Sequence, residues 1–376
     1  MTILRAMVTE ALREGLLVDA LDESFEHHSP ASGSTADKVE FVSHPLRFVV
    51  KYQGDPKLVR EAKMLRRAAI REDLTPELRA ALPTIYAIKD DEPPFAYIMQ
   101  HFRGFGNMAE LLVKHQDDGA SVARFLNAAL DLLLAAYASS AARPEVPILP
   151  DVRRINLGRL ERLEGFASGP SGPSDPDQAA LFGLLNRPGL INDEPVPPFS
   201  ELAEGLRDDW DRISHRFLPA FATFVHGDPN PENILLRPEG SLVRVKLIDP
   251  KEWGDGDYVF DIAKISHYLM VTWAVEKADR LRDYELNTSS TPWTLRYRLD
   301  IPGEIRDGIG IIEARLRQFA EDPPPPSWRD PGTRHGRCAI ICPWQPTCWA
   351  SRRAGSRAGP ISRPIPGRHS STSAKD

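Results

Sequence analysis

The chain has 376 residues, of which 41% are hydrophobic, so it can bury a sizeable core in one bilobal unit or two domains. Its formal net charge of -6 at pH 7 does not favour a nucleic acid or an anionic membrane surface as a partner. The composition therefore predicts a globular protein that binds neither.

The N-terminal residues 1–26 are predicted to form an amphipathic helix, because charged residues recur among the apolar ones. These charges also interrupt any hydrophobic core of a secretory signal. The most apolar helix, near residues 126–142, contains Asp131 and is expected to be too short to span a bilayer. We expect a soluble, cytoplasmic protein.

Residues 27–103 have the pattern of a small antiparallel sheet with one helix. Strands are predicted at residues 38–42, 47–51, 82–88 and 95–100, and a helix at residues 58–65. A turn rich in serine and glycine, residues 32–35, precedes the first of these strands. The second strand ends in Lys51, and the helix contains Glu61. The pattern breaks at residues 101–104, where we expect this lobe to end.

Residues 104–321 are predicted to form a larger, mainly helical lobe, because apolar residues recur at three- and four-residue intervals. Helices are expected from Asn107 onward and at residues 122–138, 201–217 and 262–281. Glycines and prolines at residues 168–176 indicate a loop. The acids Asp208, Asp209 and Asp211 are interpreted as a solvated helix face, with a pocket for a cationic substrate as the alternative.

The C-terminal residues 322–376 differ in character, being rich in arginine, proline, serine and glycine with little periodicity. All three cysteines lie here, without a paired C-x-x-C or an obvious fourth ligand, so a zinc site is not favoured. We interpret this tail as disordered, and an out-of-frame translation as an alternative origin. In that case the last helices of the second lobe would be missing or replaced.

A turn-rich segment at residues 226–233 carries the clearest chemical signal. It places Asp228 five residues before Asn233, with a glycine and two prolines that forbid continuous helix or sheet. This interval is that of the protein-kinase loop H-R-D-x-x-x-x-N, with Gly227 in place of the arginine. A predicted strand at residues 242–248 then ends in Asp249. Magnesium prefers such oxygen ligands together with substrate phosphates.

Three blocks together resemble the aminoglycoside phosphotransferase and choline kinase family of small-molecule kinases. They are residues 226–233, Ile248-Asp249-Pro250 and residues 254–264, and their order and gaps agree with that family without insertion. The resemblance covers roughly residues 33–281. It implies an α+β, bilobal, protein-kinase-like fold with a small antiparallel sheet lobe and a larger helical lobe.

The resemblance also implies roles for the residues that carry it. Asp228 would orient and deprotonate the acceptor hydroxyl, while Asn233 and Asp249 would hold Mg2+. Lys51, anchored by Glu61, would hold the phosphates of the nucleotide.

Further residues are assigned to the nucleotide and to support of the loop. Backbone amides near Gly33 and Ser34 would cover phosphates, and the hinge from Gln100 to Phe102 would meet the purine, although Phe102 could equally be core. Two other residues, His226 and Asp261, would brace the catalytic loop without touching substrate.

The implied reaction moves the γ-phosphoryl group of ATP, or of GTP, to a hydroxyl of a small molecule such as an aminoglycoside, a choline-like amine or a sugar. Four residues lie where the family often builds its acceptor site, but their spacing identifies no acceptor: Trp273, Glu276, Asp279 and Asp283. One alternative is a nucleotide-binding pseudoenzyme, suggested by the unusual C-terminal tail. Another is a Ser/Thr protein kinase, against which Gly227 and the lack of a D-F-G triplet at Asp249 argue.

Overall fold

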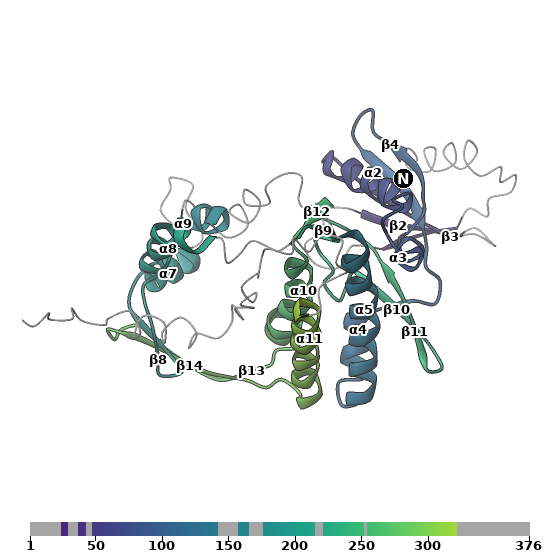
Figure 1. Cartoon of the computed structure of the whole chain (residues 1–376). Coiled ribbons are helices and arrows are strands. Elements are labelled where there is room, and N and C mark those ends of the chain that lie inside the picture. Colours follow the sequence, from purple (N-terminus) through teal and green to yellow (C-terminus); the bar gives the residue numbers. More distant parts are fainter. Residues whose placement is uncertain are drawn as a thin grey trace, which may run out of the picture. The chain divides into compact units, whose positions relative to one another are not determined.

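The computed structural model of the protein describes residues 24–28, 37–42, 47–141, 157–164, 176–214, 221–251 and 254–321 (Figure 1). All of them belong to one compact unit, Met1–Arg337. The expected C-terminal tail with its cysteines lies outside the described residues, as do most of the expected N-terminal helix and residues 168–175 of the expected loop.

A five-stranded antiparallel sheet, in the order β1-β2-β3-β5-β4, forms the N-terminal part. Its strands are β1 (Ser24–His28), β2 (Asp37–Val42), β3 (Arg47–Gln53), β4 (Ile85–Lys89) and β5 (Phe95–Gln100). Strand β1 corrects the last three residues of the helix predicted over residues 1–26, because the chain from Ser24 onward is extended and pairs with β2. Residues 1–23 lie outside the described part.

The helix α2 (Lys57–Ala69) packs on this sheet against β3, β4 and β5. Its buried residues Leu58, Ala62 and Leu65 recur at helical spacing and form one apolar stripe. Arg66 and Arg67 lie in its last turn, where positive charge interacts favourably with the helix dipole. A short helix, α3 (Pro76–Ala81), follows before β4.

The larger part is mainly helical, and several of its helices begin at a side chain that caps them. Asn107 accepts a hydrogen bond from Glu110 N (2.7 Å) at the start of α4 (Met108–Lys114), and Asp118 accepts one from Ser121 N (3.2 Å) at the start of α5 (Gly119–Ser140). The remaining helices are a helical segment at residues 157–164, α7 (Pro176–Leu185), α8 (Phe199–Asp208), α9 (Trp210–Ile213), α10 (Tyr258–His267), the π-helix η2 (Tyr268–Lys277) and α11 (Gly303–Glu321).

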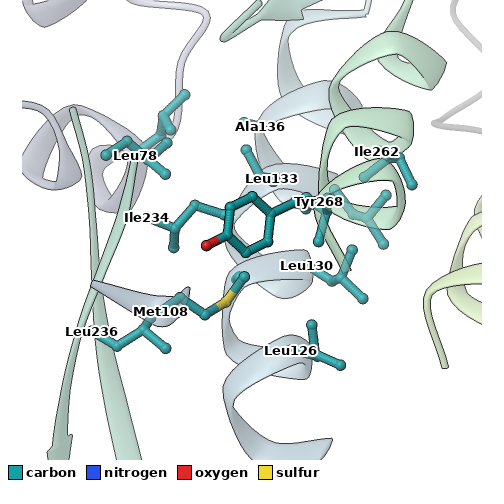
Figure 2. Close-up of a cluster of buried hydrophobic side chains, with 14 of the residues drawn as sticks. Leu78, Met108, Leu126, Leu130, Leu133, Ala136, Ile234, Leu236, Ile262 and Tyr268 are labelled. Carbon is teal, nitrogen blue, oxygen red and sulfur yellow. The ribbon is translucent and has the colours of Figure 1, made fainter. Parts of the chain in front are cut away.

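Helix α5 is the centre of the core. Leu126, Leu130 and Leu133 lie on its buried face, and Figure 2 shows them with Ile262 and Tyr268, which come later in the chain than residues 226–233. With 22 residues it is longer than expected and could cross a membrane by length and composition alone, as core helices also can. In the structure α5 packs against α11, β9 and β11.

Short strands hold the segment predicted to carry the chemistry. Strand β9 (Thr223–Val225) enters the segment and β10 (Ile234–Glu239) leaves it. The neighbours of β10 are β11 (Leu242–Leu247) and β6 (Gly106–Asn107), while β9 pairs with β12 (Gly254–Gly256). The segment is therefore anchored at both ends by antiparallel pairs.

The chain after α10 differs from the prediction. The helix expected to reach residue 281 continues only to Lys277, and a hairpin of β13 (Leu281–Asn287) and β14 (Trp293–Leu299) follows. Strand β14 also pairs in parallel with β7 (Gly189–Ile191), which pairs with β8 (Glu194–Val196). The predicted α+β class, a small antiparallel sheet followed by a larger and mainly helical part, is confirmed.

Candidate active site

The loop at residues 226–233 is fixed by its own backbone and by the chain after β11. Asn233 N donates to Asn230 O (2.8 Å), and Lys251 N donates to His226 O (3.1 Å). Gly227 has φ +80°, and a Cβ there would lie 1.5 Å from Lys251 O. Glycine is required at this position because the backbone conformation is left-handed and the backbone of Lys251 occupies the space that a side chain would need.

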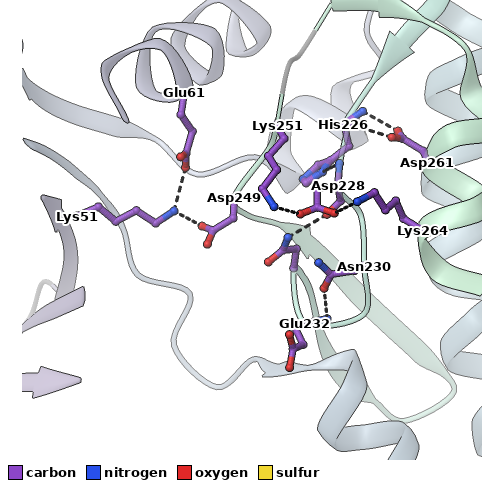
Figure 3. A network of polar contacts seen from close by, with 12 residues as sticks. Lys51, Glu61, His226, Asp228, Asn230, Glu232, Asp249, Lys251, Asp261 and Lys264 are labelled. Atoms are coloured by element: carbon purple, nitrogen blue, oxygen red, sulfur yellow. Dashed lines mark hydrogen bonds and ion pairs between the residues drawn. The ribbon is translucent and has the colours of Figure 1, made fainter. Parts of the chain in front are cut away.

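Asp261, near the start of α10, holds the entrance of the loop (Figure 3). Its carboxylate accepts hydrogen bonds from His226 N (2.6 Å), Gly227 N (2.7 Å) and the hydroxyl of Tyr137 (2.9 Å). Burial raises the pKa of Asp261 to about 6, although these hydrogen bonds act in the opposite direction. A fully buried carboxyl group with three donors fixes the backbone of the loop directly.

His226 supports the loop as a neutral side chain. It is buried, and its Nδ1 accepts a hydrogen bond from Asp228 N (3.4 Å). Burial lowers the pKa of His226 to about 4, so the imidazole carries no charge at pH 7. Its contacts are those of a bracing residue.

Asp228, the predicted base, lies at the centre of the network in Figure 3. Its side chain is only 5% exposed, and both carboxylate oxygens have a cationic partner. Lys251 Nζ lies 2.6 Å from Oδ2, and Lys264 Nζ lies 3.0 Å from Oδ1. Burial alone would raise the pKa of Asp228, but the two ammonium groups outweigh it and hold that pKa below its ordinary value.

The two predicted metal ligands both follow Asp228 in the sequence. Asn233 donates its amide to Asp228 O (2.9 Å), which leaves its carboxamide oxygen as the ligand atom. Asp249 follows β11 with φ +55°, a strained conformation for a residue with a side chain, and its carboxylate contacts the Lys51 ammonium. Strain of this kind is concentrated at functional sites.

These two residues fit Mg2+ better than a metal held by protein alone. No group of three or more His, Cys, Asp or Glu side chains that could hold a metal occurs among the residues that the structure describes. Magnesium usually takes one or two carboxylates and completes its shell with water and substrate phosphates. One carboxylate and one carboxamide oxygen match that preference.

Lys51 connects the N-terminal sheet to this network. Its ammonium lies 2.9 Å from Glu61 Oε1 and contacts Asp249, and the hydroxyl of Tyr97 donates to the same Glu61 oxygen (2.5 Å). Burial tends to lower the pKa of Lys51, but the two carboxylates outweigh it and raise that pKa above its ordinary value. The structure thus keeps a buried, charged ammonium group next to Asp249.

The remaining predicted nucleotide residues are less directly connected. Gly33 and Ser34 lie outside the described residues. Gln100 Oε1 accepts a weak hydrogen bond from Thr84 N (3.5 Å), and Phe102 is buried with Lys246 Nζ 4.9 Å from its ring centroid. The roles of these four residues in nucleotide binding stay predictions.

The acids proposed for acceptor binding have solvated surroundings. Asp208 and Asp211 are exposed, and Asp209 forms a surface ion pair with Arg212 (2.5 Å). Asp279 and Asp283 also form surface ion pairs, with Arg282 and Arg298. These contacts favour the solvated face over a pocket for a cationic substrate.

The sequence reasoning missed two lysines and two tyrosines that complete the site. Lys251 and Lys264 lie in or beside the motif blocks, but their spacing from Asp228 gave no signal of contact. Tyr97 and Tyr137 come from β5 and α5, and nothing in their local pattern marks their hydroxyls as partners of Glu61 and Asp261.

Comparison with known proteins gives a family. The sequence model of the phosphotransferase enzyme family matches residues 30–297, which include every residue of the network described above. Among curated protein sequences, none matches this chain.

Solved structures give weaker similarities. A protein of Ralstonia eutropha JMP134 assigned as an aminoglycoside phosphotransferase is 16% identical, with 70% of each chain covered and a TM-score of 0.38. Spectinomycin phosphotransferase APH(9)-Ia, solved with ADP and spectinomycin, is 13% identical, with 69% of this chain and 73% of the other covered and a TM-score of 0.41. Aminoglycoside phosphotransferase APH(4)-Ia is 12% identical, with 83% and 99% covered and a TM-score of 0.42. The family match carries the assignment: this chain belongs to the phosphotransferase enzyme family of small-molecule kinases.

Proposed function

We propose that this protein transfers the γ-phosphoryl group of ATP to a hydroxyl group of a small molecule in a reaction that needs Mg2+. The observation that carries the proposal is the single chain of contacts from Glu61 through Lys51 to Asp249, beside the lysine-bound carboxylate of Asp228. These contacts place a phosphate-binding cation on a metal ligand, and the base lies beside them in Figure 3.

Each residue in this network has a distinct task in the proposed reaction. Asp228 orients the acceptor hydroxyl and takes its proton as the acceptor oxygen bonds to the γ-phosphorus. The bond from that phosphorus to the oxygen of the leaving ADP breaks, and ADP keeps the electron pair. Asn233 and Asp249 offer hard oxygen ligands, and Mg2+ held there would supply positive charge beside the phosphates. Lys51, positioned by Glu61, binds the phosphates of the nucleotide.

Positioning and charge neutralisation supply most of the acceleration expected for such a transfer. The buried brace of Asp261 on two loop amides supports this proposal, because a base must be held accurately to act on an oriented hydroxyl. The acceptor is proposed only as a hydroxyl-bearing small molecule, and GTP remains an alternative donor. A cytoplasmic location, without a nucleic-acid or membrane partner, belongs to the same proposal.

The first test is thermal unfolding of the full chain with Mg2+ and ATP together and with each one omitted. A ligand at about 100 times its Kd should stabilise the folded protein by about 3 kcal/mol. We expect this increase in stability only when Mg2+ and ATP are both present. The variant Asp249→Asn should abolish it. The matched control is Asp283→Asn, at a surface carboxylate paired with Arg298, which should keep the full shift.

Turnover is tested by ADP release over a panel of aminoglycosides, choline-like amines and sugars. ADP release that depends on an acceptor and is abolished by Asp228→Asn supports phosphoryl transfer to a small molecule. A stabilising response to nucleotide with no turnover on any acceptor supports the pseudoenzyme. Phosphorylation of a generic protein substrate would instead support the Ser/Thr kinase alternative.

A further inference from the structure

The carboxylate of Asp228 is capped on both oxygens by lysines from two different segments. Lys264 comes from α10, three residues after the brace Asp261, and Lys251 comes from the chain just after Asp249. In this arrangement each oxygen accepts from an ammonium group, so an acceptor hydroxyl that donates to Asp228 has to share an oxygen with a lysine. Movement of one lysine away would leave one carboxylate oxygen to the acceptor hydroxyl alone.

The two lysines differ in how firmly they are placed. The side chain of Lys251 is 69% exposed, whereas that of Lys264 is 38% exposed. The backbone of Lys251 is fixed, because its N–H donates to His226 O and its carbonyl oxygen fills the space beside Gly227. Because the four-carbon side chain is flexible and the backbone is fixed, the exposed ammonium group can move by roughly a few ångströms while it stays at the site. Lys251 is therefore the group that can leave.

The expected destination of this ammonium follows from charge. Residues 229–232, between Asp228 and Asn233, contain no lysine or arginine, so the catalytic loop supplies no cation of its own. Lys51 is already held by Glu61 and Asp249. A phosphoryl group in transfer carries negative charge on three oxygens and is stabilised by cations aimed at them. Lys251 follows the metal ligand Asp249 by two residues, and its ammonium contacts the base, so this cation lies within reach of both segments.

We propose that Lys251 is a catalytic residue, whose ammonium leaves Asp228 when substrates bind and contacts the transferring γ-phosphoryl group, while Lys264 remains on Asp228 and positions it. This inference rests on the proposed function above. The exchange releases one carboxylate oxygen for the acceptor hydroxyl and delivers a cation to the phosphoryl group in the same movement. During the transfer the hydroxyl proton goes to Asp228 and the electron pair of the broken phosphorus–oxygen bond goes to ADP, while Lys251 keeps its protons.

The decisive measurement compares two nucleotides by isothermal titration calorimetry in the presence of Mg2+. ADP lacks the γ-phosphoryl group, and AMP-PNP carries an unreactive one. We expect Lys251→Gln to weaken AMP-PNP binding about tenfold, the scale of one charge-assisted hydrogen bond, and to leave ADP binding within about twofold. Lys251→Arg keeps the charge and should restore most of the preference for AMP-PNP.

Two further variants locate the effect. Lys264→Gln should leave the ratio of AMP-PNP to ADP affinity unchanged, because Lys264 is not assigned to the phosphoryl group. Lys114→Gln, at an exposed residue in the last turn of α4, serves as the control for loss of one positive charge and should change neither affinity. If an acceptor is found, Lys251→Gln should lower kcat about 100-fold with little change in the acceptor KM.

The outcomes separate this inference from the proposed function. Wild-type protein that binds neither nucleotide would remove the proposed function and this inference with it. If wild-type protein binds both nucleotides, two results for Lys251→Gln would overturn the role of Lys251 and leave the proposed function standing. One is an unchanged preference for AMP-PNP over ADP, and the other is an equal loss of affinity for both nucleotides. Loss of that preference in Lys264→Gln instead would overturn the assignment to Lys251. Thermal unfolding of each variant checks that its fold is retained.

Discussion

Lys51 on β3 and Glu61 on α2 form an ion pair with 2.9 Å between Nζ and Oε1, at a point where the lysine side chain is only 4% exposed. The same ammonium contacts Asp249, so one buried cation lies between two carboxylates. Removing it would leave two partly buried negative charges without their shared partner.

We therefore expect Lys51→Met to lower the free energy of unfolding by about 3 kcal/mol, in addition to weakening nucleotide binding. Urea unfolding followed by circular dichroism measures the change. Lys57→Met is the matched control, because Lys57 is an exposed lysine with a surface partner, Asp55, at 3.5 Å. It should cost less than about 0.5 kcal/mol, and equal losses in the two variants would contradict a buried role for Lys51.

The close approach of Lys251 O to Gly227 predicts a second difference. Gly227→Ala should lower the free energy of unfolding by more than about 3 kcal/mol, because a methyl group cannot fit beside that oxygen. Gly240 also has a positive φ, +60°, but nothing lies within 4 Å of its missing Cβ. Gly240→Ala should cost only the backbone strain, about 1 kcal/mol. Urea unfolding of both variants gives the two losses of stability, and the difference between them measures the cost of the collision with Lys251 O.

The buried carboxyl of Asp261 predicts a pH dependence of stability. Its pKa of about 6 in the folded protein exceeds the ordinary 3.8, so the folded state keeps a proton that the unfolded chain has lost. The resulting stabilisation is complete below about pH 4 and is lost as the pH rises through about 6. Between pH 4 and pH 7, the stability of wild type relative to Asp261→Asn should fall by about 2.5 kcal/mol.

His226 acts in the opposite direction, because its pKa is lowered to about 4 and its contribution grows as the pH rises towards 6.5. Both proteins of the pair retain His226, so its contribution cancels in the comparison. Thermal or urea unfolding at half-unit pH steps gives the two curves. Parallel curves over this range would show that Asp261 is ionised throughout.

The position of Asp228 predicts a loss of turnover without loss of nucleotide binding. Asp228→Asn keeps an oxygen acceptor for one lysine but cannot take a proton, so we expect kcat to fall about 1000-fold. Calorimetry with ADP and Mg2+ should give a Kd within about threefold of wild type, since Lys51, Asn233 and Asp249 are unchanged. A parallel loss of ADP affinity would mean that Asp228 acts on the nucleotide and not on the acceptor.

Much of this arrangement could be predicted from the sequence, because turn chemistry and strand pattern are local. Two prolines and a glycine define the loop at residues 226–233, and the apolar run before Asp249 defines a strand that ends there. The structure places the Asp261 carboxylate on the amides of His226 and Gly227, as the family resemblance implied. The pair of Lys51 and Glu61 is likewise present.

The remaining features depend on tertiary contacts that leave no local pattern. A lysine stem reaches several possible carboxylates, so the spacing between Lys251 and Asp228 does not predict their contact. The hairpin of β13 and β14 carries exposed apolar residues, among them Tyr284 and Leu286, which give no clear buried face. The helical periodicity of the residues before the hairpin was therefore continued into it, and the predicted helix ran past Lys277, where the observed helix ends.

The parallel pairing of β7 with β14 has a consequence for how the chain is made. Gly189 contacts the ring of Trp293 so closely that a side chain there would collide with it, and about 100 residues, including the whole catalytic loop, separate the two. At roughly 5–20 residues per second, a ribosome needs about 5–20 s to synthesise that interval. Throughout this delay one edge of β7 has no partner strand and is open to pairing with other nascent chains. Slow codons between these strands would therefore lower the yield of folded protein, even where they leave the sequence unchanged.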